Sequence, residues 1–265
     1  MTVLPDEILA YYERGDEDQR LRAGVERLEY WRTQDVLRRL LPATARVLDV
    51  GGGSGVHAEW LAADGHDVEL IDPVPLHVAQ ASRLPGVTAR AGNALDLDVA
   101  DESFDVVLLL GPLYHLTEPA DRLRALGEAR RVARAGGLVV VATISRFAPL
   151  HDVLRRGRYF DAAVRDRVET SVATGAHRPR ATDELFTTAY FHEPDEIVGE
   201  VGAAGLDVTQ QYGLEGAAWL ISDVDSWLDD PDRRADVLRA LRLTESAPSL
   251  RGVSAHVLTA ARRVP

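Results

Sequence analysis

The sequence of 265 residues contains neither cysteine nor lysine. Without cysteine the protein can form no disulfide, no zinc site with thiolate ligands and no cysteine nucleophile. All 30 basic residues are arginine, and 42 acidic residues leave a formal net charge of −12. Binding that neutralises phosphates needs clustered positive charge, so the composition argues against a nucleic-acid partner.

Long hydrophobic runs are also missing. No stretch approaches the roughly 18 consecutive apolar residues of a membrane span, and residues 1–22 lack the basic start and apolar core of a signal peptide. We therefore expect a cytoplasmic protein that does not insert into a membrane, either monomeric or homodimeric. The hydrophobic content of 46% is enough for the core of a single domain over residues 1–265.

The most informative feature is a glycine-rich loop. Residues 47–55 read Val-Leu-Asp-Val-Gly-Gly-Gly-Ser-Gly, and a second apolar run, residues 67–71, ends in Asp72. A glycine loop between a strand and a helix lets backbone approach a ligand closely, and the helix N-terminus favours negative charge. An acid that closes the next strand can accept hydrogen bonds from ribose hydroxyls. The pair predicts a nucleoside cofactor.

The glycine spacing bears on which nucleoside it is. Gly51, Gly53 and Gly55 form Gly-x-Gly-x-Gly, whereas the dinucleotide fingerprint is Gly-x-Gly-x-x-Gly, so the match to NAD is partial. The loop resembles the first motif of the class I S-adenosylmethionine-dependent methyltransferases, and Asp72 resembles the acid that ends their second motif. This resemblance implies S-adenosyl-L-methionine as the cofactor, S-adenosyl-L-homocysteine as its product, and no metal.

The resemblance continues along the chain. Residues 90–94 match the segment that meets the adenine ring, although Asn93 stands where the family commonly has an acid. Residues 103–116 match the fourth strand and its loop, and residues 129–142 match the next helix, glycine turn and strand. Together the matching segments cover roughly residues 30–145 and 190–263.

The family fold is α/β and Rossmann-like, with a mostly parallel seven-stranded sheet and helices on both faces. Alternating strands and helices of these lengths agree with it. Residues 206–209 and 256–261 read as two late strands with no helix between them, which the family pairs as a terminal antiparallel hairpin. The cofactor-binding core then occupies residues 42–145, and residues 190–265 complete it.

Two segments are additions to this core. Residues 1–41 predict an N-terminal cap of one or two amphipathic helices that end before Pro42. They either cover the sheet or, as in related methyltransferases, fold over the cofactor, with Tyr11 or Tyr12 in contact with it.

The second addition, residues 146–189, is rich in charge and follows the fifth strand. Ligand crevices of open α/β sheets lie beyond the carboxyl ends of the strands, which favours a helical lid that recognises the substrate over a merely solvated surface. An excursion at residues 213–250, with Trp219 and Trp227, is expected to complete the pocket wall.

The resemblance also assigns cofactor contacts. The backbone of the glycine loop would approach the methionine part, Asp49 would orient its amino group, and Asp72 would bind the ribose. His77 or its apolar neighbours would lie against adenine, and Asn93 would read its polar edge. The full set expected to bind the cofactor is Tyr12, Asp49, Gly51, Gly52, Gly53, Asp72, Pro73, His77, Asn93, Ala94, Leu110 and Gly111.

Methyl transfer by SN2 displacement mainly requires the acceptor to be held in line, and a base helps where the acceptor loses a proton. His115 is the candidate base, because it lies in the loop after the fourth strand and an unperturbed imidazole titrates near neutral pH; ordering that loop is its alternative role. Tyr114 is a wall residue or a proton donor. His192 either borders the pocket or belongs to the start of a helix near Asp195.

These features predict an enzyme that methylates an oxygen or nitrogen, in preference to a carbon, of a small-molecule metabolite such as a natural-product intermediate. A nucleic-acid or protein methyltransferase is the first alternative. Enzymes of that kind that act on exocyclic amines carry Asn, Asp or Ser where this chain has Gly111. The second alternative is a protein that keeps the cofactor site without transferring methyl groups, since one fold hosts several functions.

Overall fold

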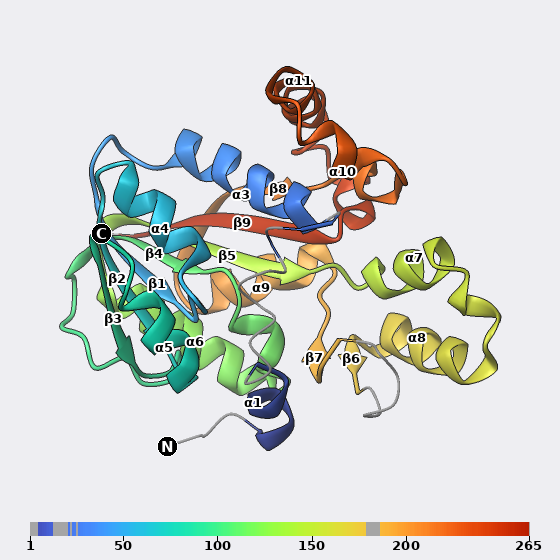
Figure 1. Cartoon of the computed structure of the whole chain (residues 1–265). Helices are drawn as coiled ribbons and strands as arrows, with labels where there is room; N and C mark the ends of the chain where they lie inside the picture. Colours follow the sequence, from blue (N-terminus) through green and yellow to red (C-terminus); the bar gives the residue numbers. More distant parts are fainter. Residues whose placement is uncertain (1–4, 13–20, 22, 25, 179–185, 265) are drawn as a thin grey trace.

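The computed structural model describes residues 5–12, 21, 23–24, 26–178 and 186–264. Its centre is a seven-stranded sheet with the order β3-β2-β1-β4-β5-β9-β8 (Figure 1). The first five of these pair in parallel, whereas β9 is antiparallel to both β5 and β8. The predicted mostly parallel sheet with a terminal antiparallel pair is confirmed. The strands are β1 (Arg46–Val50), β2 (Asp67–Asp72), β3 (Val87–Ala91), β4 (Phe104–Leu109), β5 (Ala133–Ile144), β8 (Leu206–Gly213) and β9 (His256–Arg263).

Helices cover both faces of the sheet, as predicted. Successive strand residues point to opposite faces, so Val47 packs in one apolar cluster and Leu48 in the other. The Val47 side is covered by α3 (Glu26–Leu40), α4 (Val56–Ala63) and α5 (Pro75–Ala81), and the Leu48 side by α6 (Pro119–Val132) and α9 (Pro194–Ala203). The central strands are buried on both faces, which explains their nearly continuous apolar sequence.

The expectation that no helix lies between the two last strands was wrong. The segment between β8 and β9 contains α10 (Val224–Trp227) and α11 (Pro231–Arg242), together with short 3-10 turns at Ala218–Leu220 and Pro248–Val253. Much of α11 is charged, and its start is capped by Asp230, whose side chain accepts from two backbone N–H groups. Because so many of its residues are charged, α11 lacks the broad apolar stripe that would predict a helix from sequence. The strands still pair directly because these helices pack against α3 and not between them.

A buried ion cluster fixes this excursion to α3. Nη2 of Arg32 lies 2.5 Å from Oε2 of Glu245, and Nη2 of Arg39 lies 2.7 Å from the same oxygen. Asp35 pairs with Arg32 and with Arg242 at the end of α11. Since the side chain of Arg32 is fully buried, removing one partner would leave a buried charge uncompensated.

The N-terminal cap contains α1 (Asp6–Tyr12) and α3, and α3 ends at Leu40, before Pro42 as predicted. No helix among the described residues is long and apolar enough to cross a membrane.

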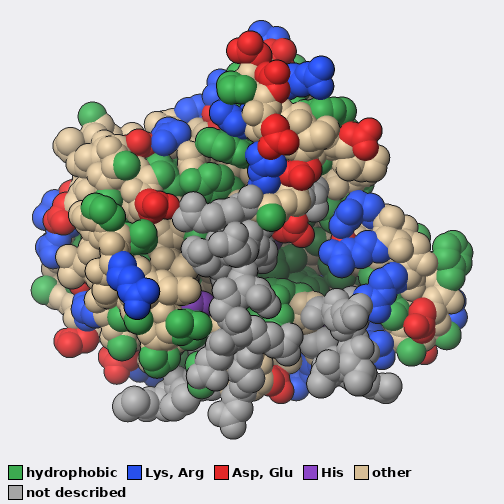
Figure 2. Space-filling view, in the orientation of Figure 1, with side chains coloured by type: hydrophobic (Ala, Val, Ile, Leu, Met, Phe, Trp, Pro, Cys, Tyr) green, Lys and Arg blue, Asp and Glu red, His purple; other side chains and the backbone are tan. Residues whose placement is uncertain are grey.

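The insertion after β5 is helical, as predicted. It comprises α7 (Ala148–Arg155), a 3-10 turn at Arg158–Phe160, α8 (Ala162–Thr174) and the two-residue strands β6 (Ala176–His177) and β7 (Ala189–Tyr190). Helices α7 and α8 lie beyond the carboxyl end of β5 and carry a small core of their own (Figure 1). Arginine side chains are prominent on this part of the surface (Figure 2), where Arg155 and Arg156 both pair with Asp152.

Candidate functional site

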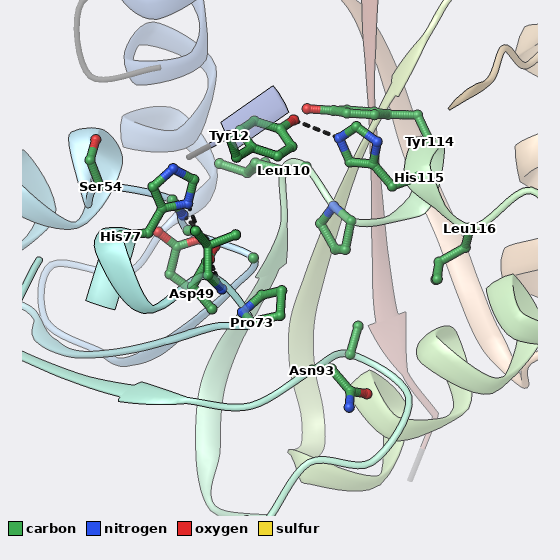
Figure 3. A pocket seen from close by; sticks show the side chains of 18 of the residues that line it. Tyr12, Asp49, Ser54, Pro73, His77, Asn93, Leu110, Tyr114, His115 and Leu116 are labelled. Carbon is green, nitrogen blue, oxygen red and sulfur yellow. Dashed lines mark hydrogen bonds and ion pairs between the residues drawn. The ribbon is translucent and has the colours of Figure 1, made fainter. Parts of the chain in front are cut away.

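A cavity of about 240 Å³ opens at the carboxyl ends of β1, β2 and β4. Every residue predicted to bind the cofactor contributes to its lining, and so do Tyr114 and His115. Asp49 and His77 lie on one side and Tyr114 and His115 on the other, with Tyr12 between them (Figure 3). The described residues from distant parts of the sequence thus converge on one site.

The loop after β1 admits only glycine at critical positions. Gly51 and Gly53 have φ angles of 70° and 58°, a region that other residues rarely adopt. A Cβ atom on Gly52 would lie 2.6 Å from Oδ2 of Asp49 and 2.6 Å from Cδ1 of Leu70. The glycines therefore let the chain turn sharply over Asp49 and bring backbone to the cavity wall.

The carboxylate of Asp49 is buried and unsatisfied. It is 1% exposed, and no described residue donates a hydrogen bond to either of its oxygens. Burial, and secondarily the charge of Asp72, raise the pKa of Asp49 to about 7. A buried acceptor without a donor suits a ligand that brings a positively charged donor, which is what the amino group of S-adenosylmethionine offers.

Asp72 is held by the protein through both oxygens. Oδ2 accepts from the backbone N–H of Gly53 at 2.9 Å, and Oδ1 accepts from that of Val74 at 2.9 Å. Nδ1 of His77 lies 3.1 Å from Oδ1. A carboxylate offers about four acceptor positions, so these contacts orient Asp72 and leave room for about one further donor.

His77 and Asn93 line the cavity and are also bonded within the protein. Nδ1 of His77 lies against Asp72, while its buried Nε2 has no partner among the described residues. The side-chain oxygen of Asn93 accepts from the backbone N–H of Leu95 at 2.8 Å. This turn leaves the amide group of Asn93 fixed at the cavity wall.

The loop after β4 carries the candidate base. Residues Leu113–His115 form a 3-10 turn, and Nε2 of His115 lies 2.6 Å from the hydroxyl of Tyr12 (Figure 3). On the other side of the ring, Nδ1 lies 3.5 Å from the carbonyl oxygen of Thr188. A proton on Nδ1 directed at that carbonyl would leave Nε2 as the acceptor for the Tyr12 hydroxyl.

Phe186 is a site residue that the sequence reasoning missed. Its ring centroid lies 5.6 Å from that of His115, 5.9 Å from that of Tyr114 and 5.7 Å from that of Tyr11. An aromatic residue at the end of a polar stretch was the only signal for it in the sequence. The insertion reaches the candidate base through Phe186 and Thr188, whereas α7 and α8 stand farther out along the chain.

His192 is not among the residues that line the cavity. It is 1% exposed, and its Nε2 lies 3.3 Å from Oε2 of Glu200 on α9. Helix α9 begins at Pro194 and carries a capping box in which Glu193 and Glu196 bond each other's backbone N–H groups. Of the two roles predicted for His192, the structure agrees with the second: it lies beside the start of a helix and does not border the cavity.

One group among the described residues could hold a metal ion. Glu29, Glu215 and His256 bring one ligand atom each to within 4.8 Å of one another. Glu215 is already bonded, since its carboxylate accepts from the hydroxyl of Ser254 at 2.7 Å and from the backbone N–H of His256 at 2.9 Å. These bonds join the excursion to the start of β9, and Glu29 also lines the cavity.

Comparison with known proteins identifies the family. Residues 48–141 match the family model described as a methyltransferase domain. The chain is 33% identical over 202 residues to a demethylmenaquinone methyltransferase of Roseiflexus sp., covering 71% of this chain and 79% of that protein.

Two further matches extend the comparison. A ubiquinone biosynthesis O-methyltransferase of Azorhizobium caulinodans is 30% identical over 174 residues, which is 64% of this chain and 61% of that enzyme, so the chain spans less than two thirds of its length. The fold resembles that of an S-adenosylmethionine-dependent methyltransferase from Methanosarcina mazei, with a TM-score of 0.59, 18% identity, and coverage of 86% of this chain and 97% of the other. The glycine loop, the acid closing β2 and the extent of the sequence match together show that the chain belongs to the class I S-adenosylmethionine-dependent methyltransferases.

Proposed function

We propose that this protein transfers a methyl group to an oxygen atom of a small aromatic molecule, with His115 as the proton acceptor. The observation that carries this proposal is the hydrogen bond of 2.6 Å between the Tyr12 hydroxyl and Nε2 of His115 at the cavity wall. It presents a phenolic hydroxyl to an imidazole nitrogen in the arrangement that a phenolic substrate would need. The cofactor, when bound, supplies an electrophilic methyl group.

The cofactor contacts follow from the geometry of the wall. Asp49 would receive the amino group of the methionine part, because its buried oxygens lack a donor within the described chain. Asp72 would accept from one ribose hydroxyl, because Gly53, Val74 and His77 already use most of its acceptor positions. Gly111 and the Leu110 carbonyl would border the amino acid part, while Pro73, Asn93 and Ala94 would enclose the adenine.

The acceptor side is aromatic. Tyr12, Tyr114 and Phe186 surround His115, and the ring of Tyr114 lies 4.7 Å from the imidazole. Such rings favour a flat, apolar ligand, which edge-to-face and offset contacts hold in a fixed orientation. The relative from Azorhizobium caulinodans is a ubiquinone biosynthesis O-methyltransferase, which supports oxygen as the accepting atom.

Transfer would balance as a single displacement. The acceptor oxygen forms a bond to the methyl carbon as the carbon–sulfur bond breaks, and the electron pair of that bond stays on sulfur. The hydroxyl proton of the acceptor passes to Nε2 of His115, either by replacing the Tyr12 hydroxyl there or through it. Holding the reacting atoms in line contributes about 7–11 kcal/mol in well-positioned reactions, more than a base alone.

The first experiment separates the cofactor from the reaction. S-adenosylmethionine and S-adenosylhomocysteine are expected to raise the melting temperature by mass action, and NADH is not. The protein is then incubated with S-adenosylmethionine and a panel of catechols, phenols and aromatic amines, and products are sought by mass spectrometry. A methylated catechol or phenol would support the proposal. A methylated amine would overturn oxygen as the accepting atom and indicate nitrogen instead. Stabilisation without any methylated product would favour a protein that binds the cofactor without methyl transfer.

A further inference from the structure

Arg122 lies outside the cavity lining but holds the loop that carries His115. Its side chain is 2% exposed and belongs to α6, the helix that starts just after this loop. Nη1 donates to the carbonyl oxygens of Leu116 at 2.9 Å and Thr117 at 3.0 Å. The backbone carbonyls of the two residues that follow His115 therefore both accept hydrogen bonds from one buried guanidinium group.

The other side of this guanidinium is fixed by a carboxylate. Nε of Arg122 lies 2.9 Å from Oε1 and 3.0 Å from Oε2 of Glu200, and Nη2 lies 2.7 Å from Oε1. Burial alone would raise the pKa of Glu200, but hydrogen bonds from His192 and Arg122 lower it, so the carboxylate is held charged. A planar guanidinium with two-point contacts to a carboxylate has little freedom to rotate.

The same guanidinium reaches the insertion. Its Cζ lies 4.0 Å from the ring centroid of Tyr190, which is a cation–π contact. Tyr190 belongs to β7, two positions after Thr188, whose carbonyl oxygen faces Nδ1 of His115. Arg122 thus contacts both chain segments that flank the imidazole, the loop on one side and β7 on the other.

We propose that Arg122 is a positioning residue that sets the orientation and tautomer of His115, with Glu200, Tyr190 and His192 as its supports. By fixing the Leu116 and Thr117 carbonyls and the β7 segment, it keeps Nδ1 directed at Thr188 and Nε2 directed at the cavity. This inference rests on the proposed role of His115. It also gives His192 a function without contact to the cavity, because His192 acts on Arg122 through Glu200.

The test uses NMR of the imidazole groups in the full chain labelled on histidine, with S-adenosylhomocysteine as the only ligand. The chain has 8 histidines, and His115→Gln identifies the signal of His115. In Arg122→Lys we expect the nitrogen shifts of His115 to move toward a mixture of tautomers. The signals of His66 and His151, which serve as internal references, should stay in place.

The matched control is Arg131→Lys on the same helix. Arg131 also pairs with a carboxylate, Glu128, and donates to two carbonyl oxygens, those of Leu97 and Val99. Its variant should leave the His115 signal unchanged. A folded Arg122→Lys protein with the parental His115 signal would overturn the proposal, and so would an Arg131→Lys protein with the same shift as Arg122→Lys.

A milder variant covers the risk that Arg122→Lys does not fold. Tyr190→Leu removes the cation–π contact while the ion pair of Arg122 with Glu200 remains, and it should move the His115 signal in the same direction. An unmoved signal in that folded variant would count against the proposal. With an acceptor found in the panel, both variants should lose up to about 10²-fold in kcat, with the Kd of S-adenosylhomocysteine unchanged. Because the NMR signal needs no turnover, failure of His115 as the base and failure of Arg122 as its support remain distinguishable.

Discussion

The hydroxyl of Tyr12 lies 2.6 Å from Nε2 of His115, although 103 positions separate the two residues in the chain. The ring of Tyr12 also lies 5.4 Å from that of His77, on the opposite side of the cavity (Figure 3). One side chain of the N-terminal cap therefore spans the site from the proposed cofactor side to the proposed acceptor side. Tyr12 and His115 therefore form the link between the two sides, and His115 is the group whose replacement should affect catalysis most.

Replacing the proposed base should slow the chemical step. His115→Gln is expected to lower kcat by about 10²–10⁴-fold, the usual contribution of general base catalysis. Tyr12→Phe should show a smaller loss, because the imidazole remains. The measurement is the initial rate against pH with a methylated member of the acceptor panel. The control is His66→Gln, because His66 lies outside the cavity lining. If His115→Gln and His66→Gln turned over equally fast, His115 would be removed from the mechanism.

Asp49 should make the stability of the ligand-free protein depend on pH. Its pKa is raised to about 7 in the fold, so the folded protein holds a proton that the unfolded chain releases at lower pH. The corresponding stability is present at acid pH and is lost as the pH rises from the ordinary carboxyl range through about 7. Asp49→Asn, which cannot ionise, should therefore melt higher than the parent at pH 8, with a smaller difference at pH 5. The same variant should bind S-adenosylmethionine more weakly; a lower melting temperature at pH 8 would contradict this account.

Asp72 and Asp67 stand at the two ends of β2 and allow a matched comparison. Asp72 is 4% exposed at the cavity, whereas the side chain of Asp67 is 79% exposed. Hydrogen bonds to a charged group contribute about 1.5–3 kcal/mol, so Asp72→Ala should weaken S-adenosylhomocysteine binding about 10–100-fold. Isothermal calorimetry measures this, with circular dichroism as the check on folding. Equal affinity in Asp72→Ala and Asp67→Ala would exclude Asp72 as a cofactor ligand.

Two glycines should respond oppositely to alanine. A Cβ on Gly52 would lie 2.6 Å from Asp49 and Leu70 atoms, whereas a Cβ on Gly127, inside α6, meets nothing within 4 Å. Gly52→Ala should cost about 1–3 kcal/mol of stability through crowding and should weaken cofactor binding. Gly127→Ala should stabilise by up to about 1 kcal/mol through helix propensity. Chemical denaturation measures both, and a neutral Gly52→Ala would show that the loop has room to shift.

Much of the fold could be predicted because short sequence patterns determine its strands, helices and glycine loop. The apolar runs that form β1, β2 and β4 alternate with helical segments, and the glycine loop sits where a ligand requires it. Helix α11 was missed because its first turns are charged and its few apolar residues pack on α3, a contact that no local pattern reveals. Tertiary packing, and not intrinsic propensity, stabilises such a helix.

The part of the site that belongs to local motifs could likewise be predicted from the sequence. Residues that belong to ordered motifs, such as Asp49 and Asp72, lie together at the cavity. Phe186 and the partners of His192 were not foreseeable, because their positions depend on where the chain returns after a long insertion. Contacts between segments far apart in sequence are decided by the assembled core and not by the spacing of the residues that make them.

The two ends of the insertion meet at one point. Ser145 and His192 form an isolated parallel bridge, the N–H of His192 donates to the Ile144 carbonyl at 3.0 Å, and that of Arg146 donates to the His192 carbonyl at 2.9 Å. Because these hydrogen bonds hold the two ends of the insertion together, the strand β5 and the start of α9 keep the same spacing whatever length of chain lies between them. A change in the length or sequence of the intervening segment therefore need not displace β5 or α9, which this closure holds side by side.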